Sequence, residues 1–208
     1  MTATASDSIV RTRRSPILEE PGRGTSARLV VALHGAADTP RRMVQAAREL
    51  DGGARIVAPL GLWGTYSGAM NIQAFSWFCE LSDGAEPEPV GFGRGLHDVD
   101  SLLVELGQPA TLMGIGQGAT IALALARLAP SRLDAVVAIG GCRATLPPDT
   151  DPPGPRSSPP VLWLHDNAAR LVPHAEEPTL RAEALLDLDE PLAAANLARA
   201  RAWLNSHR

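Results

Sequence analysis

The sequence predicts an α/β protein with a compact, doubly wound, mostly parallel β-sheet flanked by helices. Short apolar runs recur without polar alternation, as expected for strands covered on both faces. Segments that fit helices separate these runs, and such alternation implies right-handed crossovers. The expected strands are 29–33, 55–58, 111–113, 135–139, 161–164 and 184–189. The expected helices are 40–50, about 96–106, 117–128 and 191–204.

The elements divide the chain into an N-terminal segment and one domain. Residues 1–26 are polar and rich in Arg, Pro and Gly, which fits either a flexible leader or a short edge hairpin. Residues 27–208 read as a single domain. Pro40 after Thr39 fits a first helical position behind an N-cap. The proline-rich stretch 146–160 predicts an irregular surface loop.

Composition narrows the class of protein. The 208 residues are 45% hydrophobic and 20% charged, which is typical of one globular domain. The net charge of −4 gives no electrostatic case for nucleic acid or anionic membrane. Apolar runs are too short to span a bilayer, and no secretory signal is visible. The two cysteines lie far apart without metal-ligand spacing, so we expect no metal, no cofactor and a cytoplasmic location.

Residues 113–118, Met-Gly-Ile-Gly-Gln-Gly, have the frame of a nucleophile elbow. In the pattern Gly-x-Ser-x-Gly a serine sits on a sharp strand-to-helix turn. Gly116 stands at the serine position and has no side chain with which to attack an ester. Two other interpretations are a turn chosen only for close packing and a dinucleotide fingerprint ending at Ala119. Against the fingerprint, the turn lies mid-chain and the next strand ends in glycines instead of an acidic residue.

Together with Leu-His-Gly-Ala-Ala-Asp at 33–38, the elbow resembles the α/β-hydrolase superfamily. More narrowly, it resembles the phospholipase/carboxylesterase branch that includes acyl-protein thioesterases. Three further features match that branch in order: Trp77-Phe78, His165 followed by Val172-Pro173, and Trp203-Leu204. The resemblance covers about residues 28–204. It implies an α/β-hydrolase fold and a Ser-His-Asp triad whose members can be checked one by one.

Mapped through this resemblance, the triad is degenerate. The nucleophile falls on Gly116 and the acid on Ala169. The histidine is expected after the strand at 184–189, where Glu190-Pro191 follow instead. The resemblance also implies an oxyanion hole of backbone N–H groups, which survive the loss of side chains. Those donors would be Ala36 or Ala37 and Gln117, the last at a helix N-terminus that favours negative charge. The plain alternative is that these amides only cap a helix.

Other polar residues near the expected strand ends compete for a catalytic role. Asp38, Asp166 and His174 are the acid/base candidates, although turn-bonding or structural roles are common for such residues. Cys142 is a candidate nucleophile only in a cationic or helix-terminal setting. By the resemblance, the connection 61–90 roofs the pocket. An apolar wall is then expected from aromatic residues, or else these belong to the core: Tyr66, Phe75, Trp77 and Phe78.

Three functional hypotheses follow. The first is a non-hydrolytic enzyme that orients a hydrophobic, carbonyl-bearing small molecule for cyclisation, elimination or isomerisation. The second is a pseudoenzyme that binds a small ligand or a protein partner. The third is a residual esterase or thioesterase that uses Cys142 or a bound water. The sequence is also compatible with a homodimer.

Overall fold

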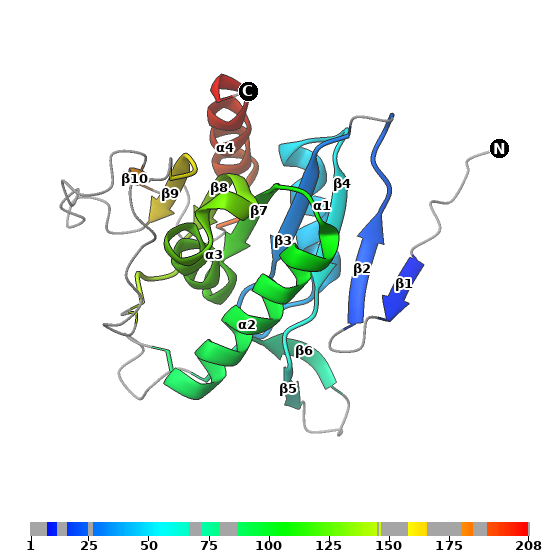
Figure 1. Cartoon of the computed structure of the whole chain (residues 1–208), viewed down its shortest axis with the longest axis vertical. Coiled ribbons are helices and arrows are strands. Elements are labelled where there is room, and N and C mark those ends of the chain that lie inside the picture. The colour runs from blue at the N-terminus through cyan, green and yellow to red at the C-terminus, as the bar shows by residue number, and fades with distance from the viewer. Residues whose placement is uncertain are drawn as a thin grey trace.

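The computed structural model describes residues 8–11, 16–24, 27–66, 72–79, 87–144, 146, 158–165, 180–184 and 191–207. Its centre is an eight-stranded sheet in the order β1-β2-β4-β3-β7-β8-β9-β10 (Figure 1). The strands are β1 Ser8–Arg11, β2 Pro16–Glu20, β3 Leu29–Leu33, β4 Arg55–Pro59, β7 Ala110–Ile115, β8 Leu133–Ile139, β9 Val161–His165 and β10 Leu180–Ala184. From β4 to β10 neighbouring strands are parallel, whereas β1 and β2 are antiparallel to their neighbours. The predicted fold class is confirmed.

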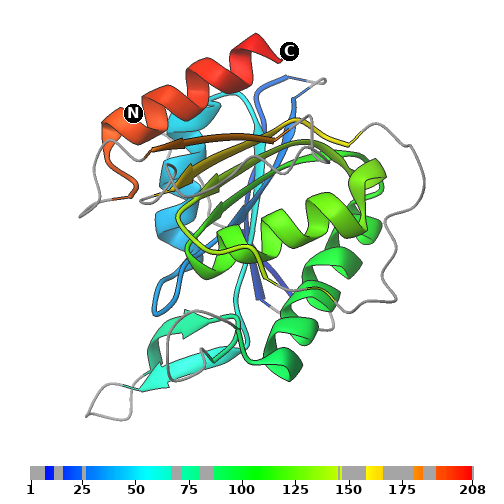
Figure 2. The same cartoon turned by 90° about the vertical axis from the view of Figure 1, so that its left-hand side faces the viewer.

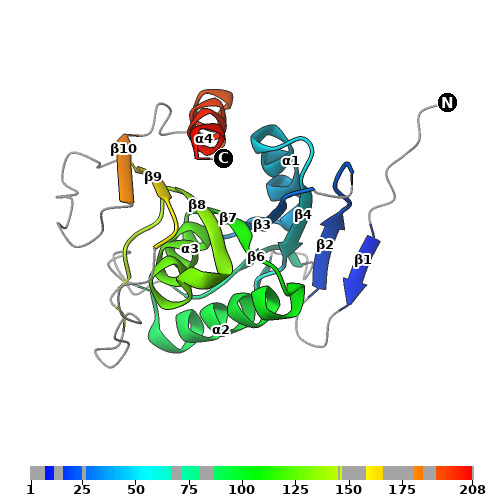
Figure 3. The ribbon, with the colours of Figure 1, turned by 45° about the horizontal axis from the view of Figure 1, so that its top comes forward.

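Helices cover both faces of the sheet (Figure 3). They are α1 Pro40–Leu50, α2 Pro89–Leu106, α3 Gln117–Leu128 and α4 Ala194–Ser206, with a 3₁₀ turn η1 at Pro130–Arg132. One core cluster lies between the sheet and α2 and α3, and a second lies between the sheet and α1 and α4. The central strands β3 and β7 are buried along their whole length because both of their faces are covered.

The helices α1 and α3 have the predicted bounds, with Pro40 at the start of α1. Helix α2 begins seven residues before the expected position 96. Glu88 caps it by accepting hydrogen bonds from the N–H groups of Val90 and Gly91. Gly91 and Gly95, in the first turns of α2, are points of close packing. A Cβ there would lie 3.2 Å from Phe78 Cβ and 3.1 Å from Ile121 Cδ1, respectively.

The C-terminal elements also differ from expectation. The structure describes a strand β10 at Leu180–Ala184, parallel to β9, and the strand expected at 184–189 lies outside the described residues beyond Ala184. Helix α4 begins at Ala194, three residues later than the expected 191.

The N-terminal residues contribute to the sheet. Strands β1 and β2 form an antiparallel pair, and β2 continues the sheet by pairing with β4. Ile17 of β2 is buried in the core cluster beneath α2 and α3. On the same strand, Glu19 forms an ion pair with Arg55 at 2.7 Å and Glu20 with Arg48 at 2.5 Å.

A second, two-stranded sheet projects from the main body near the start of α2 (Figure 2). It consists of β5 Trp63–Tyr66 and β6 Ile72–Ser76, with Trp63 opposite Ser76. We call this hairpin the arm. Phe75 and Asp38 bond each other's backbone at 3.1 and 2.9 Å, so the arm is joined to the turn that follows β3.

Candidate functional site

The turn between β7 and α3 has the geometry of a nucleophile elbow. Gly116 lies between Ile115 and Gln117 with φ 51° and ψ −116°, a backbone conformation that residues with a side chain rarely adopt. The flanking glycines are required by close packing. A Cβ at Gly114 would lie 2.3 Å from the carbonyl oxygen of Gly118, and one at Gly118 would lie 2.3 Å from that of Leu33.

At Gly116 itself there is room for a side chain. Among the described residues, a Cβ built there would meet only the Cα of Gly35, at 3.8 Å. The position of the missing side chain therefore faces the turn after β3, residues 34–38. Gly116 N–H donates to Ile139 O at 2.9 Å, and Gly116 O accepts from Thr120 N–H at 3.0 Å, so the elbow backbone is fixed on both sides.

The side chain of Gln117 is buried and ties the elbow to the segment after the arm. Its Oε1 accepts from Trp77 N–H at 2.9 Å, and its Nε2 donates to Phe78 O at 2.9 Å. The sequence analysis predicted that Gln117 contributes its backbone N–H to the site. That N–H stands at the first position of α3, at the helix N-terminus.

His34, which directly follows β3, connects the turn 34–38 to Gly61 and Trp77, and we call this group of residues the opposite wall of the site. It is fully buried, its Nε2 accepts from Gly61 N–H at 2.9 Å, and its Nδ1 lies 2.7 Å from Gly35 O. This arrangement places the proton on Nδ1 and leaves the ring neutral. Burial lowers the pKa of His34 below 6.5, although the hydrogen bond to Gly35 and the charge of Asp38 oppose the shift. Trp77 stacks on the imidazole and its Nε1 donates to His34 O at 2.8 Å.

The donor expected on the turn is the N–H of Ala36 or of Ala37. Ala36 and Ala37 are both exposed. Ala37 has a φ of 51°, which is uncommon for a residue with a Cβ. Its N–H donates to the hydroxyl of Ser76 at 3.1 Å. Sequence reasoning missed Ser76, because no local signal marks a contact between residues 39 positions apart.

Asp38 is engaged in the turn and the first helix. Its Oδ1 accepts from Thr39 N–H at 2.7 Å, and its Oδ2 lies 3.6 Å from Arg42 Nη1. The backbone of Asp38 pairs with Phe75 of the arm. These contacts place the carboxylate at the start of α1, where it positions the turn.

Cys142 lies beside the first turn of α3. Its backbone N–H donates to Thr120 Oγ1 at 3.0 Å, and its Sγ lies 3.7 Å from the same hydroxyl. Gly141 approaches the elbow closely, since a Cβ there would lie 2.5 Å from Gly116 O. The thiol is thus near the elbow but hydrogen bonded to a neutral hydroxyl.

The aromatic candidates separate into buried and half-buried residues. Trp77 and Phe78 are each 3% exposed, and Phe78 packs edge-to-face on Phe92. Phe75 is half-buried on the arm. Tyr66 ends β5, and its side chain lies outside the described residues. Three further candidates also lie outside them: Asp166, Ala169 and His174.

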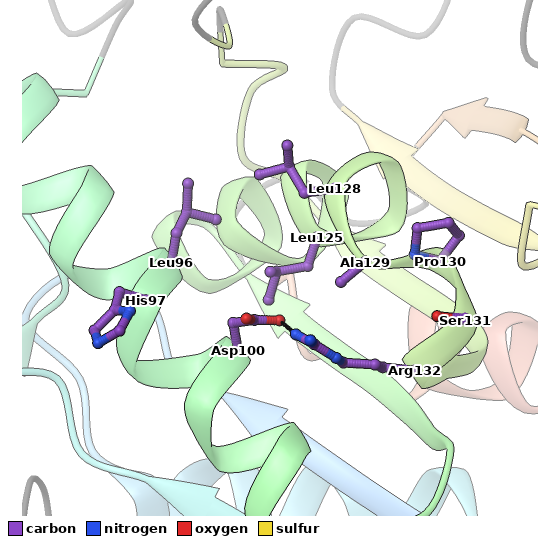
Figure 4. A pocket seen from close by; sticks show the side chains of 9 residues that line it. All are labelled: Leu96, His97, Asp100, Leu125, Leu128, Ala129, Pro130, Ser131 and Arg132. Carbon is purple, nitrogen blue, oxygen red and sulfur yellow. Dashed lines mark hydrogen bonds and ion pairs between the residues drawn. The ribbon is translucent and has the colours of Figure 1, made fainter. Parts of the chain in front are cut away.

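A cavity of about 390 Å³ lies at the far end of α3 (Figure 4). Leu96, Leu125 and Leu128 form its apolar part, and an ion pair between Asp100 and Arg132 lies at its polar side. Leu125, the first residue of α3 to line the cavity, follows Gln117 by eight positions, so about 12 Å along the helix separates the cavity from the elbow. In the described part of the chain, no group of three His, Cys, Asp or Glu side chains is placed to hold a metal.

The fold and the elbow define the α/β-hydrolase fold, and solved structures agree. A carboxylesterase from Mesorhizobium loti superposes with a TM-score of 0.70 at 19% identity, covering 95% of this chain and 98% of that one. Esterase PE8 gives 0.66 at 22% identity, covering 91% and 97%. SOBER1 of Arabidopsis thaliana gives 0.63 at 16% identity, covering 88% and 99%. No protein-family model and no curated protein sequence matches the chain. None of the helices described is long and apolar enough to cross a membrane.

Proposed function

We propose that this protein binds an apolar small molecule bearing a carbonyl or carboxylate over Gly116 and acts on it without forming an acyl-enzyme. The reaction class is cyclisation, elimination or isomerisation, in which a positioned and polarised carbonyl reacts within the ligand. The observation that carries the proposal is Gly116 itself, which has a nucleophile-elbow conformation and, among the described residues, a single atom within 4 Å of the point where a nucleophile's Cβ would lie.

Backbone donors supply the polarisation in this proposal. The N–H of Gln117 stands at the start of α3, where the helix dipole favours an oxygen that gains negative charge. The turn 34–38 lies near the same point, since Gly35 Cα is 3.8 Å from a Cβ built on Gly116. Because neither donor is a side chain, the loss of a serine leaves them in place.

Two exposed apolar side chains, at the start of the arm and just before it, are the reason for proposing that the ligand has an apolar part. Leu62 and Trp63 are 43% and 44% exposed, which is high for large apolar residues. They stand next to Gly61, whose N–H bonds His34 in the opposite wall. An exposed apolar pair beside a polar turn suits a ligand with an oxygen at one end and a hydrocarbon body.

The first test is hydrolysis of 4-nitrophenyl butyrate and octanoate by the purified protein, beside Cys142→Ala. We expect no turnover above the buffer blank for either protein. Turnover by the wild type that disappears in Cys142→Ala would instead establish a cysteine hydrolase, and turnover retained in the variant would indicate an activated water.

A second test separates an enzyme from a binding protein. Octanoate binding is measured by calorimetry, and candidate carbonyl substrates are followed by mass spectrometry. Conversion that is lost in Asp38→Asn or His174→Gln supports the enzyme. Saturable binding without conversion of any substrate would show a protein that only binds its ligand.

A further inference from the structure

The hydroxyl of Ser76 stands in front of one of the two expected oxyanion donors. It accepts the hydrogen bond of Ala37 N–H at 3.1 Å. Within the described residues this is the single hydrogen bond of the Ser76 side chain, so the hydroxyl proton has no acceptor there. A hydroxyl that accepts from an amide is polarised and becomes a better donor to a third group.

The chain on either side of Ser76 is fixed to both walls of the site. Phe75 pairs with Asp38 in the turn after β3, and Trp77 N–H donates to Gln117 Oε1 beside the elbow. The backbone of Ser76 therefore bridges the turn and the start of α3. Its position is set by hydrogen bonds on both sides, which is the condition for a preorganised donor.

Trp63 lies directly across the arm from Ser76. Opposite residues of an antiparallel pair project from the same face of a sheet, so the indole and the hydroxyl share one face. Trp63 is 44% exposed, whereas Trp77 is buried. One face of the arm thus carries a hydroxyl donor next to an accessible aromatic surface.

We infer that Ser76 and Trp63 are ligand-binding residues that recognise a fatty acyl carboxylate or carbonyl. The Ser76 O–H donates to the ligand oxygen in place of Ala37 N–H, and Gln117 N–H meets the same oxygen from the elbow. The hydrocarbon chain lies along Trp63. This assignment rests on the proposed function and adds the ligand class and two residues to it.

The experiment compares octanoate with 1-octanol, which has the same chain but no carbonyl. Calorimetry gives the affinity of both probes for the wild type, Ser76→Ala, Ser76→Thr and Trp63→Ala. Ser131→Ala is the matched control, because its exposed hydroxyl lies at the opposite end of α3. Thermal unfolding verifies that each variant is folded.

We expect the wild type to prefer octanoate and Ser76→Ala to lose about tenfold of that preference, since a hydrogen bond to a charged group is removed. Ser76→Thr keeps the hydroxyl and retains most of the preference. Trp63→Ala weakens both probes together and leaves the preference unchanged. A merely structural role of Ser76 would lower both affinities in parallel.

Two results would overturn the assignment while leaving the proposed function intact. One is a wild-type preference that Ser76→Ala keeps within twofold. The other is tighter octanoate binding by Ser76→Ala, which would mean that the hydroxyl blocks Ala37 N–H. A wild type that binds neither probe, or binds both equally, would remove the proposed function and this inference with it.

Discussion

Gln117 and Phe78 are joined through the side-chain amide of one and the backbone of the other, with Nε2 donating to the carbonyl oxygen at 2.9 Å. The same amide accepts from Trp77 N–H. The N-terminus of α3 and the segment that contains Phe78, 39 residues earlier in the sequence, are thereby held in a fixed relative position. This contact fixes the distance between the elbow and the wall formed by His34 and Trp77.

Gln117→Leu is expected to destabilise the fold by about 2–4 kcal/mol, because it leaves the buried N–H of Trp77 and carbonyl of Phe78 unpaired. Urea unfolding followed by circular dichroism measures the loss. Gln45→Leu, at an exposed position of α1, is the control and should change the free energy of unfolding by less than about 0.5 kcal/mol. Equal effects in the two variants would contradict the structural role of the Gln117 amide.

Gly116→Ser should fold, because in the described part of the chain its Cβ meets only Gly35 Cα, at 3.8 Å. The positive φ lowers stability by about 1–2 kcal/mol. Hydrolysis of 4-nitrophenyl butyrate should stay at the buffer blank, since the sequence has no histidine between 174 and 207 to activate the serine. Gly118→Ser is the contrasting variant and should not fold, as its Cβ would lie 2.3 Å from Leu33 O. A large gain in ester turnover by Gly116→Ser would disprove the proposed loss of the triad.

The lowered pKa of His34 predicts a pH dependence of stability. Between the lowered folded-state pKa and the unfolded value near 6.5, the unfolded chain binds more protons than the folded one. Stability is therefore complete above 6.5 and falls as the pH is lowered through this window. Urea midpoints from pH 8 to pH 5 for the wild type and His34→Gln isolate the contribution. The difference between the two proteins should shrink toward acidic pH, and a constant difference would contradict the assignment of a buried neutral imidazole.

The same substitution, Thr→Val, is expected to change stability in opposite directions at Thr111 and Thr120. Thr111 Oγ1 is buried without a hydrogen-bond partner among the described residues, so Thr111→Val should stabilise by about 1 kcal/mol. Thr120 Oγ1 accepts from Cys142 N–H at 3.0 Å, so Thr120→Val should destabilise by about 1–3 kcal/mol. Thermal unfolding of both variants tests the pair, and a shift of the same sign in both would refute it.

Much of the scaffold could be predicted because its signals are local. Residues adjacent in sequence determine the continuous apolar strands, the start of α1 at Pro40 and the glycines of the elbow. Helix α2 was predicted too short, and the part that was missed contains Gly91 and Gly95. These glycines are explained by the side chains of Phe78 and Ile121 that pack on them.

The walls of the candidate site depend on contacts between distant residues. Ser76 meets Ala37, and Trp77 meets both His34 and Gln117, across about 40 positions of sequence. No periodicity or short motif specifies such pairs. The sequence therefore identified the elbow and the two backbone donors as candidates, but not the serine and the buried histidine that surround them.

The antiparallel strand β2 has a consequence for handling the protein. It covers the outer edge of β4, buries Ile17 and forms ion pairs through Glu19 and Glu20. A chain started at residue 27 would leave the backbone N–H and C=O groups of β4 as a free strand edge, which is a template for intermolecular pairing. Self-association of such a truncated chain would then begin at β4, and an affinity tag is better attached to the C-terminus than allowed to replace the first twenty residues.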